Sequence, residues 1–75
     1  MTERTKQEFM IKFRGVKAHV LSKAVNRITL GINWNGCSKG HIAEAWAKAD
    51  TYTRMDKVSL VQIQQKINDV EAGKF

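Results

Sequence analysis

Apolar side chains that recur every three or four residues are the feature that most limits how this chain can fold. This spacing places apolar groups on one face of a helix, and it runs through residues 9–28, 42–49 and 60–70. The sequence therefore predicts a mainly α fold of about four short helices. The chain has 75 residues, so we expect one small domain, 1–75, with a thin core.

The start of the chain carries the signature of a helix N-terminus. Thr5 and Glu8 have the spacing of a capping box, directly ahead of the apolar Phe9. We expect a helix to begin near residue 6. Glycine is a poor helix former, so Gly15 is expected to divide the stretch into two shorter helices.

The same N-terminal residues also fit a β-hairpin with strands at 8–13 and 16–21. That hairpin would place Lys12 directly opposite Lys17, and two like charges facing each other across strands are unfavourable. We therefore prefer the helix. The alternative is an α+β fold with this hairpin, a third strand at 28–34 and two C-terminal helices.

A change of apolar period marks residues 28–34. Alternate residues are apolar there, as in a half-buried strand, and the turn pair Asn35 and Gly36 follows. We expect one short strand near 28–34. An isolated strand leaves an unpaired edge, so we also expect a homodimer formed through it.

Two helices are expected after this strand. Ser38 can cap the first, which should end near Asp50. Ser59 and Gln62 form a capping box at the start of the second, and Gly73 is a suitable stop.

A partial phosphate-loop motif lies at the junction of the expected strand and the following helix. Gly31, Gly36 and Ser38 have the required spacing, but Cys37 occupies the lysine position. A cysteine cannot supply the missing positive charge. The parallel sheet that carries such a loop also needs far more chain than 75 residues. We therefore expect no nucleotide site.

Metal binding and catalysis are not expected either. Cys37 and His41 have helical spacing, but structural zinc needs four ligands and His19 is the one further donor of that kind. No acid, base and nucleophile can be combined, so we predict no enzyme and no cofactor. One cysteine and no export signal favour a cytoplasmic protein, and apolar runs of three residues favour no membrane contact.

The charge distribution gives the best functional signal. The formal net charge is +6, of which residues 1–36 hold +5. On one continuous helix Lys12, Lys23 and Arg27 would lie near one face, because eleven residues make almost three turns. A basic face attracts polyanions. The expected contact residues are Lys12, Arg14, Lys17, Lys23, Arg27 and Lys39.

Trp34 is a candidate for base stacking or for an interface, although its place in the apolar alternation also fits a core residue.

Two functions fit these features. The first is non-catalytic binding of DNA or RNA through phosphate contacts. The alternative is a small inhibitor or adaptor, of the kind that phages and other mobile elements encode, whose basic face docks on an acidic partner protein.

The expected order of a strand and two helices resembles ribbon-helix-helix regulators, although this chain has a long N-terminal extension. In that family two protomers pair one strand each and place the ribbon in the major groove. The resemblance implies that Thr29, Gly31 and Asn33 face bases.

Overall fold

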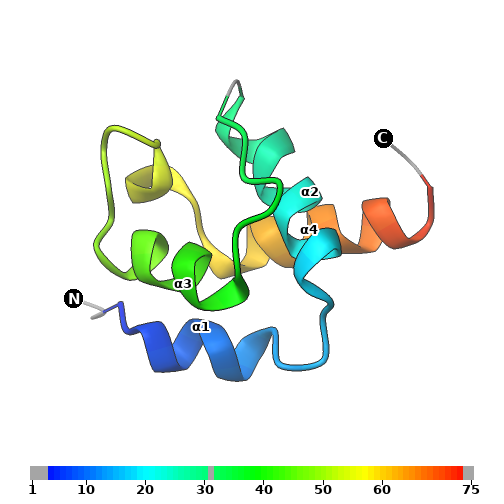
Figure 1. Cartoon of the computed structure of the whole chain (residues 1–75), viewed down its shortest axis with the longest axis horizontal. Coiled ribbons are helices and arrows are strands. Elements are labelled where there is room, and N and C mark those ends of the chain that lie inside the picture. The colour runs from blue at the N-terminus through cyan, green and yellow to red at the C-terminus, as the bar shows by residue number, and fades with distance from the viewer. Residues whose placement is uncertain (1–3, 31, 74–75) are drawn as a thin grey trace.

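The computed structural model describes residues 4–30 and 32–73, and this part of the chain is helical without a strand. The mainly α prediction is therefore confirmed. The elements are α1 (Lys6–Lys12), α2 (Ala18–Thr29), α3 (Lys39–Ala47), the short 3-10 helix η1 (Met55–Lys57) and α4 (Leu60–Glu71) (Figure 1).

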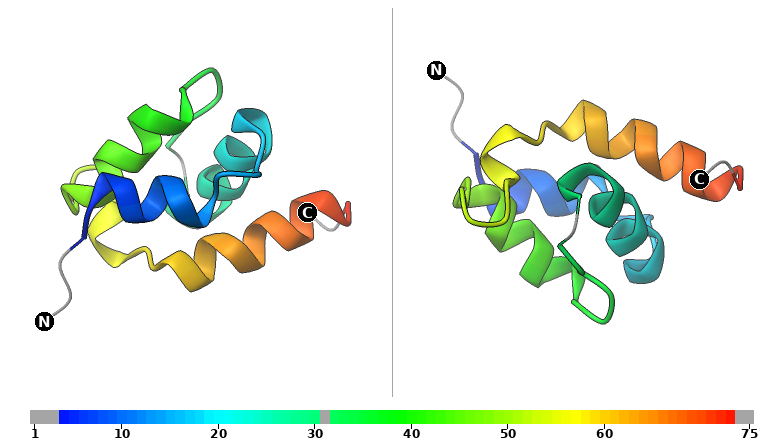
Figure 2. Two further views of the ribbon diagram at one scale, coloured as in Figure 1. Left: turned by 90° about the horizontal axis from the view of Figure 1, so that it is seen from below. Right: turned by 90° about the horizontal axis from the view of Figure 1, so that it is seen from above.

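The four α-helices pack as two pairs. α1 packs against α3, and α2 packs against α4 (Figures 1 and 2). Loops of several residues join the helices, and the longest connect α2 to α3 and α3 to α4. Seen from below, α1 crosses in front of the molecule and α4 runs beside it (Figure 2, left).

The N-terminal residues form the predicted helices and not the hairpin. The Thr5 side chain accepts a hydrogen bond of 3.0 Å from the Glu8 backbone N–H and caps α1. Phe9 and Phe13 are fully buried and meet edge to face, with ring centroids 4.9 Å apart. A tight turn around Gly15 separates α1 from α2, as expected. The hairpin would have placed both phenylalanines in its first strand, 8–13, whereas the structure has Phe9 in α1 and Phe13 at its C-cap.

The predicted strand at 28–34 is wrong. Ile28 and Thr29 belong to the last turn of α2, and residues 32–34 form a loop. Leu30, which alternation would bury, is 68% exposed. Four alternating residues are too short a pattern to outweigh the helical stripe that precedes them, and the described residues offer no second strand to pair with. The proposed dimer through a strand edge therefore loses its basis.

The resemblance to ribbon-helix-helix regulators depended on that strand and does not hold. Thr29 is fully buried, and its hydroxyl donates to the Val25 carbonyl at 2.9 Å. Asn33 lies in a loop, and Gly31 lies outside the described residues.

The turn and the helix after it follow the prediction. The Cys37 N–H donates to the Trp34 carbonyl at 3.0 Å, and Gly36 has a φ of 85°, which glycine adopts without strain. Ser38 caps α3 by accepting from the His41 N–H at 3.1 Å. α3 then ends at Ala47, slightly earlier than expected.

The C-terminal helix is confirmed at both ends. Ser59 and Gln62 form the complete capping box, because each side chain bonds the other residue's backbone N–H. Gly73 follows the helix with a φ of 77°, the left-handed conformation typical of a helix stop.

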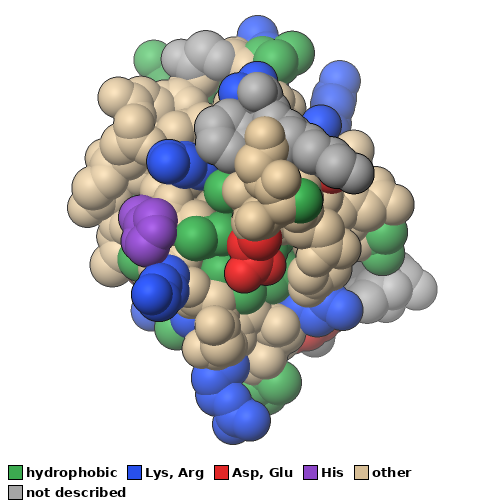
Figure 3. All heavy atoms as spheres, turned by 90° about the vertical axis from the view of Figure 1, so that its right-hand side faces the viewer, with side chains coloured by type: hydrophobic (Ala, Val, Ile, Leu, Met, Phe, Trp, Pro, Cys, Tyr) green, Lys and Arg blue, Asp and Glu red, His purple; other side chains and the backbone are tan. Residues whose placement is uncertain are grey.

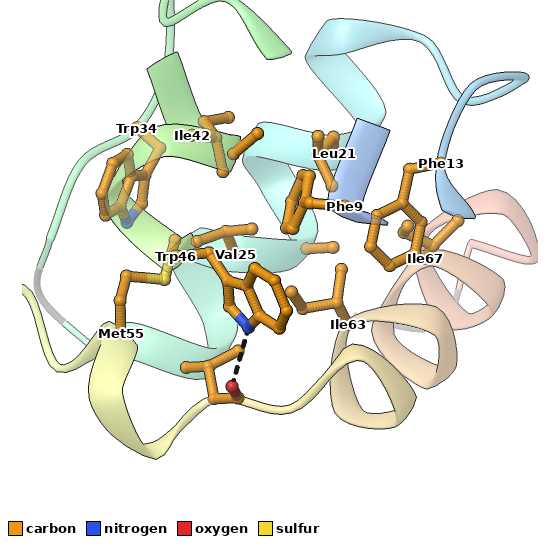
Figure 4. Packing of buried hydrophobic residues seen from close by; sticks show 13 residues of the cluster. Phe9, Phe13, Leu21, Val25, Trp34, Ile42, Trp46, Met55, Ile63 and Ile67 are labelled. Atoms are coloured by element: carbon orange, nitrogen blue, oxygen red, sulfur yellow. Dashed lines mark hydrogen bonds between the residues drawn. The ribbon is translucent and has the colours of Figure 1, made fainter. Parts of the chain in front are cut away.

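The core is one cluster to which all four α-helices contribute (Figure 4). Trp46 of α3 lies among side chains from the other helices, and its indole N–H donates to the Val58 carbonyl at 2.9 Å. α2 and α4 meet through apolar side chains on their facing sides. These are Leu21, Ala24 and Val25 of α2 and Ile63 and Ile67 of α4.

Arg4, which was not predicted as an important residue, contacts this core from outside the helices. Its guanidinium donates to the carbonyls of Met55 at 2.7 Å, Asp56 at 3.0 Å and Trp46 at 3.3 Å. It also lies 4.9 Å from the centroid of the Trp46 ring, in cation–π geometry.

Candidate nucleic-acid interface

The outward face of α2 carries a row of basic side chains. One side of this helix is buried against α4, so the opposite side faces solvent. Residues four apart in sequence lie one above another on such a face. The exposed row consists of His19, Lys23 and Arg27. The sequence of α2 contains no acidic residue.

A hollow of about 180 Å³ lies beside this row. Lys23 and Arg27 line it together with Asn26, Asn35 and Val70. Two cationic side chains and two side-chain amides, from α2 and from the loop after it, therefore line the same hollow.

Asn26 fixes the loop that borders the hollow. Its side-chain N–H donates to the Asn35 side-chain oxygen at 2.8 Å, and its own side-chain oxygen accepts from the Trp34 backbone N–H at 2.6 Å. The Asn33 side chain in turn accepts from the Asn35 backbone N–H at 2.9 Å. These bonds hold the amide of Asn35 next to the basic row.

A second group of predicted residues gathers where α1 ends and α3 begins. The Lys39 ammonium donates to the Arg14 backbone carbonyl at 3.1 Å, which brings the two residues together across 25 positions of sequence. Lys17 is close by in the chain, at the N-cap of α2, where its side chain makes no capping bond.

Lys12 lies apart from both groups. It belongs to the last turn of α1 and lines a groove between α1 and the start of α4. The expected single stripe of Lys12, Lys23 and Arg27 therefore does not form, because the turn at 13–17 puts Lys12 on a different helix. Figure 3 shows one side of the molecule, where Lys and Arg side chains surround a small acidic patch as separate points.

The net positive charge is concentrated in a shorter stretch of sequence than the N-terminal half of the chain. Residues 9–43 contain no Asp or Glu, and they contain all six predicted cationic contacts and both histidines. The rest of the chain has seven Lys or Arg and seven acids. The whole net charge of +6 therefore belongs to residues 9–43.

The first acid after this stretch is neutralised locally. Glu44 forms an ion pair with Lys48 at 3.0 Å, one helical turn along α3. The hydrogen bond and charge of Lys48, with a smaller effect from Lys6, lower the pKa of the Glu44 carboxyl. Glu44 therefore stays ionised and paired, and its charge is already balanced by Lys48.

Trp34 is a core residue, which was one of the two interpretations of its place in the sequence. It is 4% exposed, and its indole N–H donates to the Thr29 hydroxyl at 3.1 Å. The ring offers little surface on which a base could stack, so we do not include it in the candidate interface.

Other kinds of site find little support in the described residues. Within 4–30 and 32–73, no three His, Cys, Asp or Glu side chains come together in a way that could hold a metal ion. The helices of this part of the chain are also too short or too polar to cross a membrane.

Comparison with known proteins adds no further assignment. No protein-family model, curated protein or solved structure matches this chain.

Sequence reasoning missed three residues of the candidate interface. The spacing of His19 from Lys23 and Arg27 was visible once a helix was assumed. Asn26 and Asn35 could not be paired in advance, because their contact depends on how the loop returns to α2.

Proposed function

We propose that this protein binds nucleic acid without catalysis and that the basic face of α2 contacts phosphates. The observation that carries the proposal is the concentration of the whole net charge in residues 9–43, which contain no acid. Lys23 and Arg27 belong to this stretch and are exposed on the α2 face, and such cations release counterions from a nucleic acid when they contact its phosphates, which favours association.

The side chains around the α2 hollow suit a phosphodiester backbone. Arg27 can bond two phosphate oxygens with its planar guanidinium, and Lys23 supplies a compact charge. Four residues of helix rise about 6 Å, so the two cations are close enough together to contact neighbouring phosphates of one strand. The Asn26 and Asn35 amides border the same hollow and are suited to phosphate or sugar oxygens.

Arg14, Lys17 and Lys39 would extend the contact along a longer stretch of backbone. The proposed contacts are to phosphates, which carry no sequence information, so binding with little sequence preference is expected. A reducing compartment such as the cytoplasm belongs to the proposal, because a single cysteine forms no internal disulfide.

A charge-matched pair of variants tests the proposal. Lys23→Gln with Arg27→Gln removes two charges from the α2 face, and Lys57→Gln with Lys66→Gln removes two charges from outside residues 9–43. Binding to a labelled DNA duplex and to a single strand is measured by fluorescence anisotropy at about 0.1 M salt. We expect the first variant to bind at least about tenfold more weakly and the second to bind nearly as wild type. Equal weakening by both would show a general charge effect and reject the α2 face.

The alternative function is that of an inhibitor or adaptor that docks on an acidic protein. A pull-down from nuclease-treated lysate distinguishes this function from nucleic-acid binding. Nucleic-acid binding predicts that captured material disappears after nuclease treatment. One defined protein retained by the wild type, and lost with the α2 variant, would favour the alternative.

A further inference from the structure

A groove of about 500 Å³ lies between α1 and the start of α4. It is on the side of the molecule away from the loop between α2 and α3 (Figure 2). It is bordered by residues at and around α1 and by one residue of α4. These are Thr5, Gln7, Glu8, Ile11, Lys12 and Leu60. In the left view of Figure 2, α1 and the start of α4 are both turned toward the viewer.

The groove exposes apolar surface that the core does not use. Ile11 is 63% exposed, whereas Phe9 and Phe13 of the same N-terminal segment are fully buried. Ile11 and the half-buried Leu60 form the apolar part of the groove lining, and apolar surface left uncovered in a groove is a candidate contact surface.

The charges beside Ile11 are of opposite sign. Glu8 and Lys12 are one helical turn apart on α1, at a spacing that permits an ion pair. The one ion pair within residues 4–30 and 32–73 is nevertheless that between Lys48 and Glu44. The Glu8 carboxylate and the Lys12 ammonium are therefore not paired with each other.

We infer that a second copy of this chain covers the groove and that the two copies are related by a twofold axis. In a twofold interface the same patch appears on both sides, so a residue pair that forms once forms twice. With two α1 helices antiparallel, Glu8 of each copy would face Lys12 of the other. The Ile11 side chains would pack between them and against Leu60.

This charge pattern favours a second copy over an unrelated partner. A complementary surface needs an apolar centre, a cation opposite Glu8 and an acid opposite Lys12, and the groove itself supplies all three. A chain of this size also has a thin core, and burying Ile11 would add apolar contact that the monomer lacks. The inference does not rest on nucleic-acid binding and assigns Lys12 to the dimer contact.

Charge reversal tests the interface by a reciprocal design. Glu8→Lys places two cations opposite each other at both contacts, and Lys12→Glu places two acids there. A mixture of the two variants restores an opposite pair at both contacts of the heterodimer. Analytical ultracentrifugation, up to about 1 mM protein, measures the mass of each sample.

For the wild type we expect a concentration-dependent rise from 8.5 kDa toward twice that mass. Each single variant should dissociate at least about tenfold more readily, and the equimolar mixture should return to within about threefold of the wild type. Circular dichroism of each variant checks that α1 still forms. Ile11→Asp, which alters an exposed residue, should also give a monomer, whereas the distant control Tyr52→Asp should not.

Three results would overturn the inference. The first is a wild-type mass of 8.5 kDa at every concentration. The second is a dimer that Ile11→Asp leaves intact, because the copies would then meet elsewhere. The third is a mixture of folded charge variants that associates no better than either variant alone.

Discussion

Arg4 shows how much a single side chain contributes to so small a fold. Its guanidinium satisfies backbone carbonyls at the end of α3 and in η1, and it lies over the Trp46 ring. Hydrogen bonds from a charged donor are among the stronger ones in proteins. Arg4, the first described residue, thereby bonds segments that lie more than forty positions away in the sequence.

Replacing Arg4 by alanine should lower the free energy of unfolding by about 1–3 kcal/mol, because its carbonyl partners lose a charged donor. In a domain of this size, each kcal/mol corresponds to a fall of about 4–8 °C in the melting temperature. Thermal denaturation followed by circular dichroism measures this shift. Arg4→Lys should recover only part of it, since an ammonium cannot reproduce the planar fork. Full recovery with lysine would contradict this geometry.

Thr29 is a second residue whose polar group is essential in the core. Its hydroxyl donates to the Val25 carbonyl and accepts from the Trp34 indole. Thr29→Val keeps the shape and leaves the indole N–H of a buried ring without its acceptor, so we expect a loss of about 1–3 kcal/mol in chemical denaturation. Thr51→Val, at an exposed position, is the matched control and should change stability little. A neutral Thr29→Val would mean that the indole finds another partner.

At the scale of the element, helix caps explain why some helices can be predicted from sequence. Ser59→Ala removes the hydroxyl that accepts from the Gln62 N–H and should cost about 1 kcal/mol. The expected result is a lower midpoint of urea denaturation with an unchanged slope. Thr51→Ala, which removes no cap, serves as the comparison, and equal effects of the two changes would show that the cap contributes nothing.

The helices that were predicted correctly have local signals. Thr5 before α1, Ser38 before α3 and Ser59 before α4 each bond a backbone N–H three residues ahead, so a short window of sequence contains the information. The strand at 28–34 had only alternation and the following turn pair, Asn35 and Gly36, in its favour. α2 instead continues to Thr29, whose hydroxyl donates to the Val25 carbonyl one turn earlier.

The candidate interface was predictable only in part, for a related reason. The six cations could be identified from the sequence, but their grouping depends on the fold. Gly15 correctly suggested a break, and that break is what separates Lys12 from Lys23 and Arg27. The contact of Lys39 with Arg14 depends on how α1 packs against α3, which apolar spacing does not specify.

At the scale of the whole molecule, the net charge is concentrated in one part of the sequence. Residues outside 9–43 are electrically balanced, and residues 9–43 carry the entire net charge. A basic surface on a small helical domain and a separate apolar groove with both signs of charge suit two different contacts. We assign phosphates to the first and a second copy of the chain to the second.

The salt dependence of nucleic-acid binding tests the central claim most directly. The association constant for a labelled duplex is measured from about 50 to 200 mM salt, for the wild type and for Lys23→Gln with Arg27→Gln. We predict a steep linear fall of log K with log salt for the wild type, and a slope smaller in magnitude by about two for the variant, because each lost phosphate contact removes about 0.9. Identical slopes, or no binding by the wild type at about 50 mM salt, would contradict the account.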